Sequence, residues 1–213
     1  MSNFMIYGAN GFTGSLIARE AVRRGMRPIL AGRNAEKLAA LGNELGLEHR
    51  VFGLVSSVEV REGVQGLHTV LHCAGPFSQT SSPMADACLH HGVNYLDITG
   101  EENVFETLAK RDAEAKAVNV VLMPGVGFDV VPSDCLAVHL KRRLPSATRL
   151  ALGFQGAGHM SHGTALTVAE SLANGGMIRE GGQLKHVPAA WKTRTIDFGK
   201  GPVKAITIPW GDV

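Results

Sequence analysis

The chain has 213 residues, of which 45% are hydrophobic and 19% are charged, and its formal net charge is +2. This balance is typical of a soluble globular protein, and the net charge is too small to indicate nucleic acid or a membrane surface as a partner. No apolar run approaches the roughly 18 residues that a membrane span requires, and the first residues lack the pattern of a secretory signal.

Short apolar segments alternate with helical patterns along the first 123 residues. Segments rich in β-branched and aromatic residues predict six strands, at 4–7, 27–31, 49–53, 68–74, 94–98 and 118–123. Helical spacing and capping residues predict helices at 13–25, 34–45, 81–92 and 101–117. This alternation is typical of a parallel sheet covered on both faces. We therefore expect an α/β fold, a Rossmann-type doubly wound parallel sheet, in a domain of residues 1–125.

The pattern changes after residue 125. A helix is expected at 133–144, a strand at 148–156, a second helix at 163–176 and a hairpin over 193–210. The hairpin turn is expected at Gly199-Lys200-Gly201, because glycine adopts the backbone angles of tight turns. Residues 126–213 are therefore expected to form a partial α+β second domain.

The stretch "MIYGANGFTGSLIA", residues 5–18, places Gly8, Gly11 and Gly14 directly after the first expected strand. Glycine lets the backbone approach a pyrophosphate without an intervening Cβ, and amides of the following helix then face the anion. Because the triplet follows a strand and opens a helix, it predicts a dinucleotide site. A plain β-turn before a helix is the alternative.

The end of the second expected strand favours NADP as the cofactor. Sites that prefer NAD usually place an acid there to bind the ribose hydroxyls, but this chain reads "LAGRNAEK". Arg33 could form paired hydrogen bonds with a 2′-phosphate, and Lys37 adds a second positive charge one helical turn later. The alternative is that Arg33 is a solvated surface charge.

The fourth expected strand ends in Ala74-Gly75-Pro76-Phe77. A turn of small residues at the carboxyl edge of such a sheet is where the ribose and nicotinamide of a dinucleotide pass. Ala74, Gly75 and Pro76 are therefore expected to contact the cofactor. Phe77 is expected either to form a wall of the nicotinamide pocket or to pack in the core.

Several of these motifs together resemble a known family. The segments "YGANGFTG", "LAGRN", "CAGPF", "YLDITGE", "PGVGFDVVPSD" and "SHGTALT" are similar to those of the saccharopine dehydrogenase-like oxidoreductases, which include trans-acting enoyl reductase relatives. The resemblance implies an N-terminal NADP-binding domain and a C-terminal domain that shapes the substrate pocket and can form a homodimer. It implies a phosphate-binding turn made of Gly8, Asn10, Gly11, Phe12, Thr13 and Gly14, a 2′-phosphate contact at Arg33, and a nicotinamide-side loop at Gly75 and Pro76.

The chain departs from this family in length. Similar proteins continue beyond a segment like "PWGDV", complete the second sheet and return a final stretch to the first domain, whereas this chain ends at Val213. We therefore expect a fragment or a shortened relative whose second-domain sheet and active site are incomplete.

The catalytic residues are not identified by the sequence. The tyrosine–lysine pair of short-chain dehydrogenases is absent, because Gly11 and Thr99 stand four residues after the two tyrosines, Tyr7 and Tyr95. Acid–base candidates near expected strand ends are Asp97, Thr99, Glu101, Asp129 and His162, and no pattern selects among them.

Cysteine and histidine spacing does not predict a metal site. The cysteines, Cys73, Cys88 and Cys135, are odd in number and unpaired in sequence, which indicates a reduced, cytoplasmic setting and three small buried residues. "HMSHG" at 159–163 has no supporting carboxylates, and His90 and His91 are adjacent on an expected helix.

Two functions agree with these patterns. The first is an NADP-dependent oxidoreductase that transfers hydride to or from a carbonyl, an imine or an activated alkene. The second is a non-catalytic NADP-binding redox sensor that acts through a protein partner.

Overall fold

The computed structural model describes residues 3–128, 130–156 and 175–208. Contacts divide the chain into two compact units, Met1–Gly127 and Phe128–Val213. The boundary follows the segment 124–127, which contains a proline and two glycines. Among the described residues, no helix is long and apolar enough to cross a membrane.

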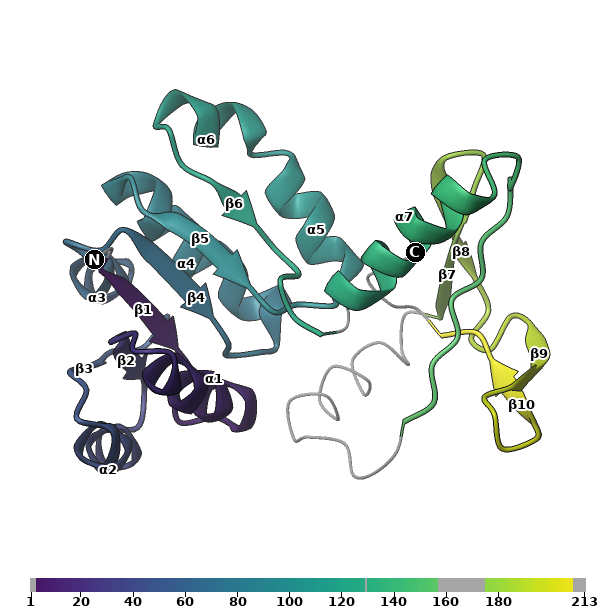
Figure 1. The fold of residues 1–213 in the computed structure, drawn as a ribbon. Coiled ribbons are helices and arrows are strands. Elements are labelled where there is room, and N and C mark those ends of the chain that lie inside the picture. Colours follow the sequence, from purple (N-terminus) through teal and green to yellow (C-terminus); the bar gives the residue numbers. More distant parts are fainter. Residues whose placement is uncertain (1–2, 129, 157–174, 209–213) are drawn as a thin grey trace. The chain divides into compact units, whose positions relative to one another are not determined.

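The first unit alternates strands and helices. Its strands are β1 (Phe4–Tyr7), β2 (Ile29–Gly32), β3 (His49–Val51), β4 (Thr69–His72), β5 (Asn94–Asp97) and β6 (Leu122–Met123). Its helices are α1 (Phe12–Arg23), α2 (Ala35–Leu45), α3 (Ser57–Val64), α4 (Phe77–His91), α5 (Glu102–Ala109) and α6 (Asp112–Ala117). Within the described residues, these strands form a parallel sheet in the order β3-β2-β1-β4-β5-β6 (Figure 1). This order confirms the doubly wound α/β fold, in which β1 to β3 extend the sheet in one direction and β4 to β6 extend it in the other.

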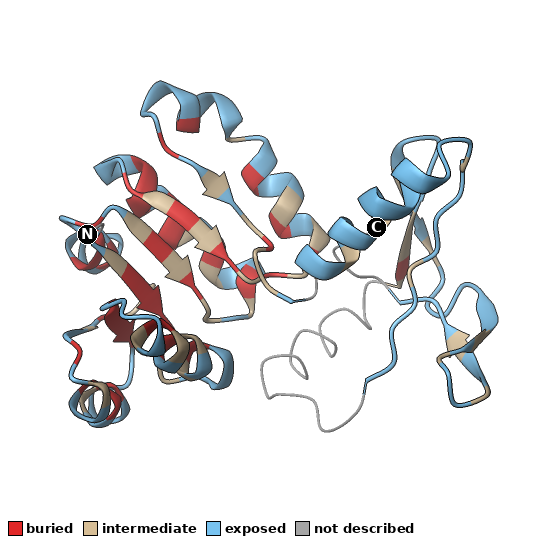
Figure 2. Cartoon of the chain, in the orientation of Figure 1, coloured by how far each residue is buried: buried red, intermediate tan, exposed pale blue. Residues whose placement is uncertain are grey.

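Alternate residues of the central strands pack into separate cores on the two faces of the sheet. Tyr7, Val70 and Tyr95 belong to a core that α3, α4 and α5 complete. Ile6 and Leu30 belong to a second core, completed by α1 and α2. Figure 2 shows the buried residues concentrated on the strands and on the helix faces toward them. Because successive side chains of a strand point to opposite faces, strands covered on both sides are apolar throughout.

The helix expected at 81–92 begins earlier than the sequence pattern predicts. α4 starts at Phe77 and contains Pro83 in its interior. The carboxylate of Glu101 accepts hydrogen bonds from the Phe77 and Ser78 amides and thus caps the helix four residues before the expected start. This cap comes from a distant part of the chain, so it overrides the local signal of serine followed by proline.

Other elements of the first unit also differ from those expected. α3 forms where no helix is predicted, and the Ser56 side chain accepts a hydrogen bond from the Glu59 amide at its start. The single helix expected at 101–117 is divided into α5 and α6, with Lys110 and Arg111 between them. β6 is shorter than the strand expected at 118–123.

The second unit contains α7 (Val131–Arg143) and two antiparallel hairpins among its described residues. β9 (Thr193–Asp197) and β10 (Pro202–Ile206) form the expected hairpin, and Gly199 and Gly201 have positive φ in its turn. β7 (Gly176–Glu180) and β8 (Gln183–Val187) form a further hairpin, which the sequence pattern does not predict.

Of the elements expected in the second unit, one strand is not formed and one helix lies mostly outside the residues that the structure describes. The strand expected at 148–156 is wrong, because these residues have no regular secondary structure. Gly153 lies beside the Ile196 side chain of β9, so this segment packs next to a strand without joining its hydrogen-bond ladder. The helix expected at 163–176 lies outside the described residues up to position 174, and Gly176 already belongs to β7.

The three cysteines differ in burial. Cys88 is buried, Cys73 is half-buried and Cys135 is exposed. The expectation of three buried cysteines is therefore wrong for Cys135, because it lies on α7, a helix on which no described residue is buried.

Candidate cofactor site

The turn between β1 and α1 lies at the carboxyl edge of the sheet, where the chain order reverses. Gly8 has φ +81°, and its amide donates a 2.7 Å hydrogen bond to the carbonyl of Ala31 in β2. A Cβ at Gly8 would lie 3.0 Å from the Cβ of Ala74, which follows β4. Both the conformation and the close packing therefore require glycine at position 8. The loops that follow β1 and β4 are in direct contact there.

Glycine at the start of α1 lets the helix pack closely against this turn. A Cβ at Gly14 would lie 2.2 Å from the Gly8 carbonyl oxygen, and one at Gly11 would lie 3.1 Å from it. Phe12 and Thr13, also expected at the phosphate turn, are exposed at the first two positions of α1. These contacts, which only small residues permit, thus orient the axis of α1 toward the glycine turn.

The first turn of α1 offers amides to an anion. Gly11 is the N-cap, and the Ser15 amide makes the first hydrogen bond of the helix, to the Gly11 carbonyl. The amides of Phe12, Thr13 and Gly14 precede that bond and so have no carbonyl one turn back. Among the described residues, no side chain caps α1, and its first turn contains no acid.

The first amides of two neighbouring helices at this edge are already bound by side chains. The Asn34 side chain accepts a hydrogen bond from the Lys37 amide at the start of α2, and the Glu101 carboxylate caps α4. These caps supply oxygen atoms where a phosphate would otherwise bind. The residues of the β1–α1 turn thus fit a pyrophosphate, whereas the starts of α2 and α4 already hold internal acceptors.

The end of β2 brings a basic side chain to the same edge. A Cβ at Gly32 would lie 2.9 Å from the Oδ1 of Asn10, so the two loops touch at this point. Arg33 and Lys37 are exposed, and neither forms an ion pair within the described part of the chain. Burial raises the pKa of Tyr7 to about 12, and the positive charge of Arg33 partly offsets this rise. Arg33 therefore contributes positive potential close to the glycine turn.

The loop after β4 is held by partly buried polar contacts to Thr80. The Thr80 hydroxyl lies 2.7 Å from the Ala74 carbonyl and 2.9 Å from the Pro76 carbonyl, and it is 3.0 Å from the Nε2 of His72. His72 is fully buried, and burial lowers its pKa to about 3. A neutral imidazole can donate from Nε2 to the hydroxyl, which then donates to a loop carbonyl. Gly75 remains exposed at the tip of the loop.

Phe77 packs in the core. Its side chain is 8% exposed, and its ring meets the His72 ring edge-on at a centroid distance of 5.3 Å. Of the two roles expected for Phe77, packing is the one that these contacts support. Neither His72 nor Thr80 is singled out by the sequence pattern, because their pairing depends on how β4 packs against α4.

The acid–base candidates after β5 form a structural network. Asp97 Oδ2 accepts from the Tyr95 hydroxyl at 2.7 Å, while Oδ1 accepts from the amides of Thr99 and Gly125 at 2.9 and 3.0 Å. The Thr99 hydroxyl accepts from the Glu101 amide at 3.0 Å. These contacts tie the loops after β5 and β6 together. The other two candidates, Asp129 and His162, lie outside the described residues.

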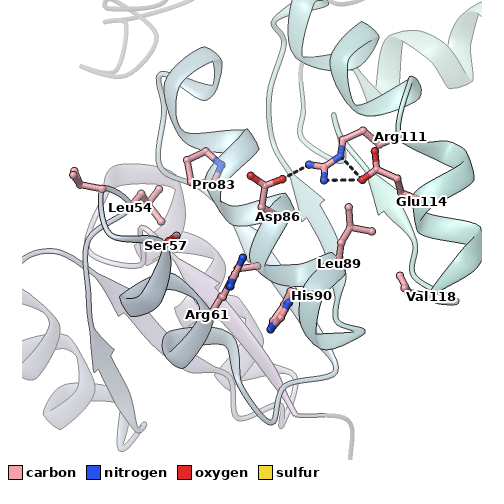
Figure 3. A pocket seen from close by; sticks show the side chains of 12 residues that line it. Leu54, Ser57, Arg61, Pro83, Asp86, Leu89, His90, Arg111, Glu114 and Val118 are labelled. Atoms are coloured by element: carbon pink, nitrogen blue, oxygen red, sulfur yellow. Dashed lines mark hydrogen bonds and ion pairs between the residues drawn. The ribbon is translucent and has the colours of Figure 1, made fainter.

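A metal centre and a surface groove are the other kinds of site to consider in this chain. Among the described residues, no group of three or more histidine, cysteine, aspartate or glutamate side chains could hold a metal ion. A groove of about 570 Å³ lies along α3, α4 and α6, and Figure 3 shows Arg111 joining Asp86 and Glu114 across part of it. The residues that line this groove do not include Arg33 or any residue of the glycine turn or of the loop after β4.

Comparison with known proteins assigns the first unit. The family model of the saccharopine dehydrogenase NADP binding domain matches residues 4–123. The chain belongs to this family. The assignment confirms the resemblance and NADP as the cofactor of the domain.

Individual relatives agree with the assignment. A human saccharopine dehydrogenase-like oxidoreductase is 25% identical over 164 residues, which cover 67% of this chain and 38% of that protein. A trans-acting enoyl reductase of Mycobacterium ulcerans is 32% identical over 150 residues, covering 65% of this chain and 35% of that protein. The chain thus spans little more than a third of the length of these relatives.

A solved structure extends the likeness in fold beyond the first unit. The apo saccharopine dehydrogenase (L-Glu forming) of Saccharomyces cerevisiae has a TM-score of 0.67 and 11% sequence identity. The match covers 97% of this chain and 49% of the yeast chain. At this level of identity the comparison supports the fold and not a shared substrate.

Proposed function

We propose that this chain is the NADP-binding part of an oxidoreductase that transfers hydride to or from a small carbonyl, imine or activated alkene compound. The observation that carries the proposal is the uncapped first turn of α1 facing a glycine turn at the switch point of the sheet. The bound nicotinamide supplies or accepts the hydride, and the chain positions it. The relatives are named as an oxidoreductase and a reductase, which favours an enzyme over a non-catalytic redox sensor.

Each part of the site has a proposed role toward the cofactor. The amides of Phe12, Thr13 and Gly14 bind the pyrophosphate, with Gly8 and Gly11 leaving it space. The adenosine half lies over the end of β2, where Asn10 and Gly32 meet. Further contacts are made by the residues of two segments: Arg33 and Lys37 at the 2′-phosphate, and Ala74, Gly75 and Pro76 along the nicotinamide ribose.

The second unit is proposed to shape the substrate pocket and to carry a homodimer interface in a cytoplasmic protein. The likeness of the yeast structure along 97% of this chain supports a common architecture for that unit. The acid–base group stays unassigned, since Asp97, Thr99 and Glu101 are engaged with one another and with main-chain amides.

Cofactor titration tests the proposal. NADPH and NADH are titrated by fluorescence into the wild-type chain, Arg33→Ala and Arg61→Ala, where Arg61 is an exposed arginine of α3 away from the turn. A hydrogen bond to a charged group contributes about 1.5–3 kcal/mol, or roughly tenfold to a hundredfold in affinity. We expect Arg33→Ala to lose that factor for NADPH alone and Arg61→Ala to behave as wild type. Equal wild-type affinities for the two cofactors would contradict the role of Arg33, and absence of binding would contradict the function.

A further inference from the structure

The first amides of α4 are bound by a residue from another loop. Glu101 Oε1 accepts a 2.8 Å hydrogen bond from the Phe77 amide, and Oε2 accepts a 2.7 Å bond from the Ser78 amide. Glu101 is 8% exposed, so this charged contact is shielded from water. Hydrogen bonds from amides to an ionised acceptor are stronger than neutral ones, and a negative charge is favourable at a helix N-terminus.

Glu101 is itself held in place by β5. Its amide donates to the Thr99 hydroxyl at 3.0 Å, and the Thr99 amide donates to Asp97 at 2.9 Å. Thr99 and Asp97 are buried. The position of the Glu101 backbone is therefore fixed by the end of a central strand and does not depend on the loop that its carboxylate binds.

The loop after β4 is thus held from two sides. Glu101 binds the amides where the loop enters α4, and Thr80 binds the Ala74 and Pro76 carbonyls from within α4. At its other end the loop touches Gly8, whose added Cβ would meet Ala74 at 3.0 Å. In a doubly wound fold the dinucleotide crosses from the β1 turn to the loop of the neighbouring strand at this point.

We propose that Glu101 is a positioning residue for the nicotinamide half of the cofactor. It fixes the main chain of residues 74–78, along which the nicotinamide ribose is proposed to bind. It acts through the Phe77 and Ser78 amides without touching the cofactor. The inference rests on the proposed function. β2, at whose end Arg33 is proposed to bind the adenosine half, lies on the far side of β1 from this loop. Glu101 therefore acts on one half of the cofactor and not on the other.

The two halves can be measured separately. NADPH carries both halves, whereas 2′,5′-ADP carries only the adenosine half with its 2′-phosphate. In Glu101→Ala we expect the NADPH dissociation constant to rise at least about tenfold, while that of 2′,5′-ADP changes less than about twofold. Arg33→Ala is the matched control, because it removes an adenosine-side contact and weakens both ligands. Circular dichroism confirms that each variant is folded.

A milder variant decides the question if Glu101→Ala does not fold. Thr99→Val keeps the shape of a buried side chain but removes the acceptor of the Glu101 amide, so the same selective loss of NADPH affinity is expected at smaller size. If the variant that folds loses affinity equally for both ligands, or for neither, the positioning role is overturned. If the wild-type chain binds neither ligand, the proposed function fails instead, so the two failures are distinguishable.

Discussion

The Tyr95 hydroxyl donates a 2.7 Å hydrogen bond to Oδ2 of Asp97, two residues further along β5. Residues two apart in a strand point to the same face, so the pair lies side by side within the buried region. Burial raises the pKa of Asp97, and the hydrogen bonds from Tyr95, Thr99 and Gly125 act against that rise. The carboxylate is thus a structural acceptor for three donors.

Two variants of Asp97 distinguish the loss of its hydrogen bonds from the loss of its charge. Asp97→Ala leaves the Tyr95 hydroxyl and the Thr99 and Gly125 amides without their acceptor, and an unsatisfied buried donor costs about 1–3 kcal/mol. We expect the free energy of unfolding to fall by about 3 kcal/mol or more. Asp97→Asn can still accept from both amides and donate to the tyrosine oxygen, so about 1 kcal/mol is expected. Urea unfolding measures both, and equal losses would contradict this account.

The buried imidazole of His72 makes stability depend on pH. Its pKa in the folded chain is about 3 because of burial, whereas in the unfolded chain it is about 6.5. Below about pH 6.5 the unfolded chain therefore binds a proton that the folded chain does not, and stability falls as the pH falls. Between about pH 7.5 and pH 5, His72 accounts for a loss of about 2 kcal/mol. His72→Leu should lose that much less over this range in urea unfolding, and an unchanged slope would refute the assignment.

Two glycine-to-alanine variants test the packing of α1 on β1. At Gly14 the new methyl group would lie 2.2 Å from the Gly8 carbonyl oxygen, so the helix must move. Overpacking of this kind costs about 3 kcal/mol. At Gly53 nothing lies within 4 Å of the added atom, so Gly53→Ala should change stability by less than about 0.5 kcal/mol. Similar unfolding midpoints for the two variants would show that the glycine at 14 is not needed for packing.

Thiol labelling tests the burial of the cysteines, all of which lie among the described residues. Cys135 is exposed on α7, whereas burial raises the pKa of Cys73 and of Cys88 to about 12. Because the thiolate is the reactive form, one thiol should react rapidly with a disulfide reagent in the native protein and three in denaturant. Cys135→Ser should abolish the rapid phase, and a surviving rapid phase would place a different cysteine at the surface.

Features set by neighbouring residues are the ones that the sequence predicts. The spacing of Gly8, Gly11 and Gly14 after a strand indicates the β1–α1 turn, since a positive φ at Gly8 and close packing at all three positions favour glycine. The apolar strands indicate the doubly wound sheet, because both of its faces are covered. The turn at Gly199 and Gly201 indicates the β9–β10 hairpin for the same local reason.

Features set by distant contacts are the ones that it does not predict. The start of α4 depends on Glu101, and the position of the loop after β4 depends on His72 and Thr80. Likewise, the apolar segment 148–156 forms no strand, since pairing requires a partner as well as a pattern. Asp97, Thr99 and Glu101 are acid–base candidates by their positions in the sequence, and their hydrogen bonds assign all three to the scaffold.

The central position of β1 in the sheet also has a consequence for biosynthesis. β1 leaves the ribosome before either of its neighbours, because Met5 pairs with Ile29 on one side and with Val70 on the other. At about 5–20 residues per second, translation reaches the second neighbour roughly 3–13 seconds after the first strand. During that interval the apolar segment "FMIY" has an unpaired edge, so this part of the nascent chain is exposed to aggregation until β4 is made.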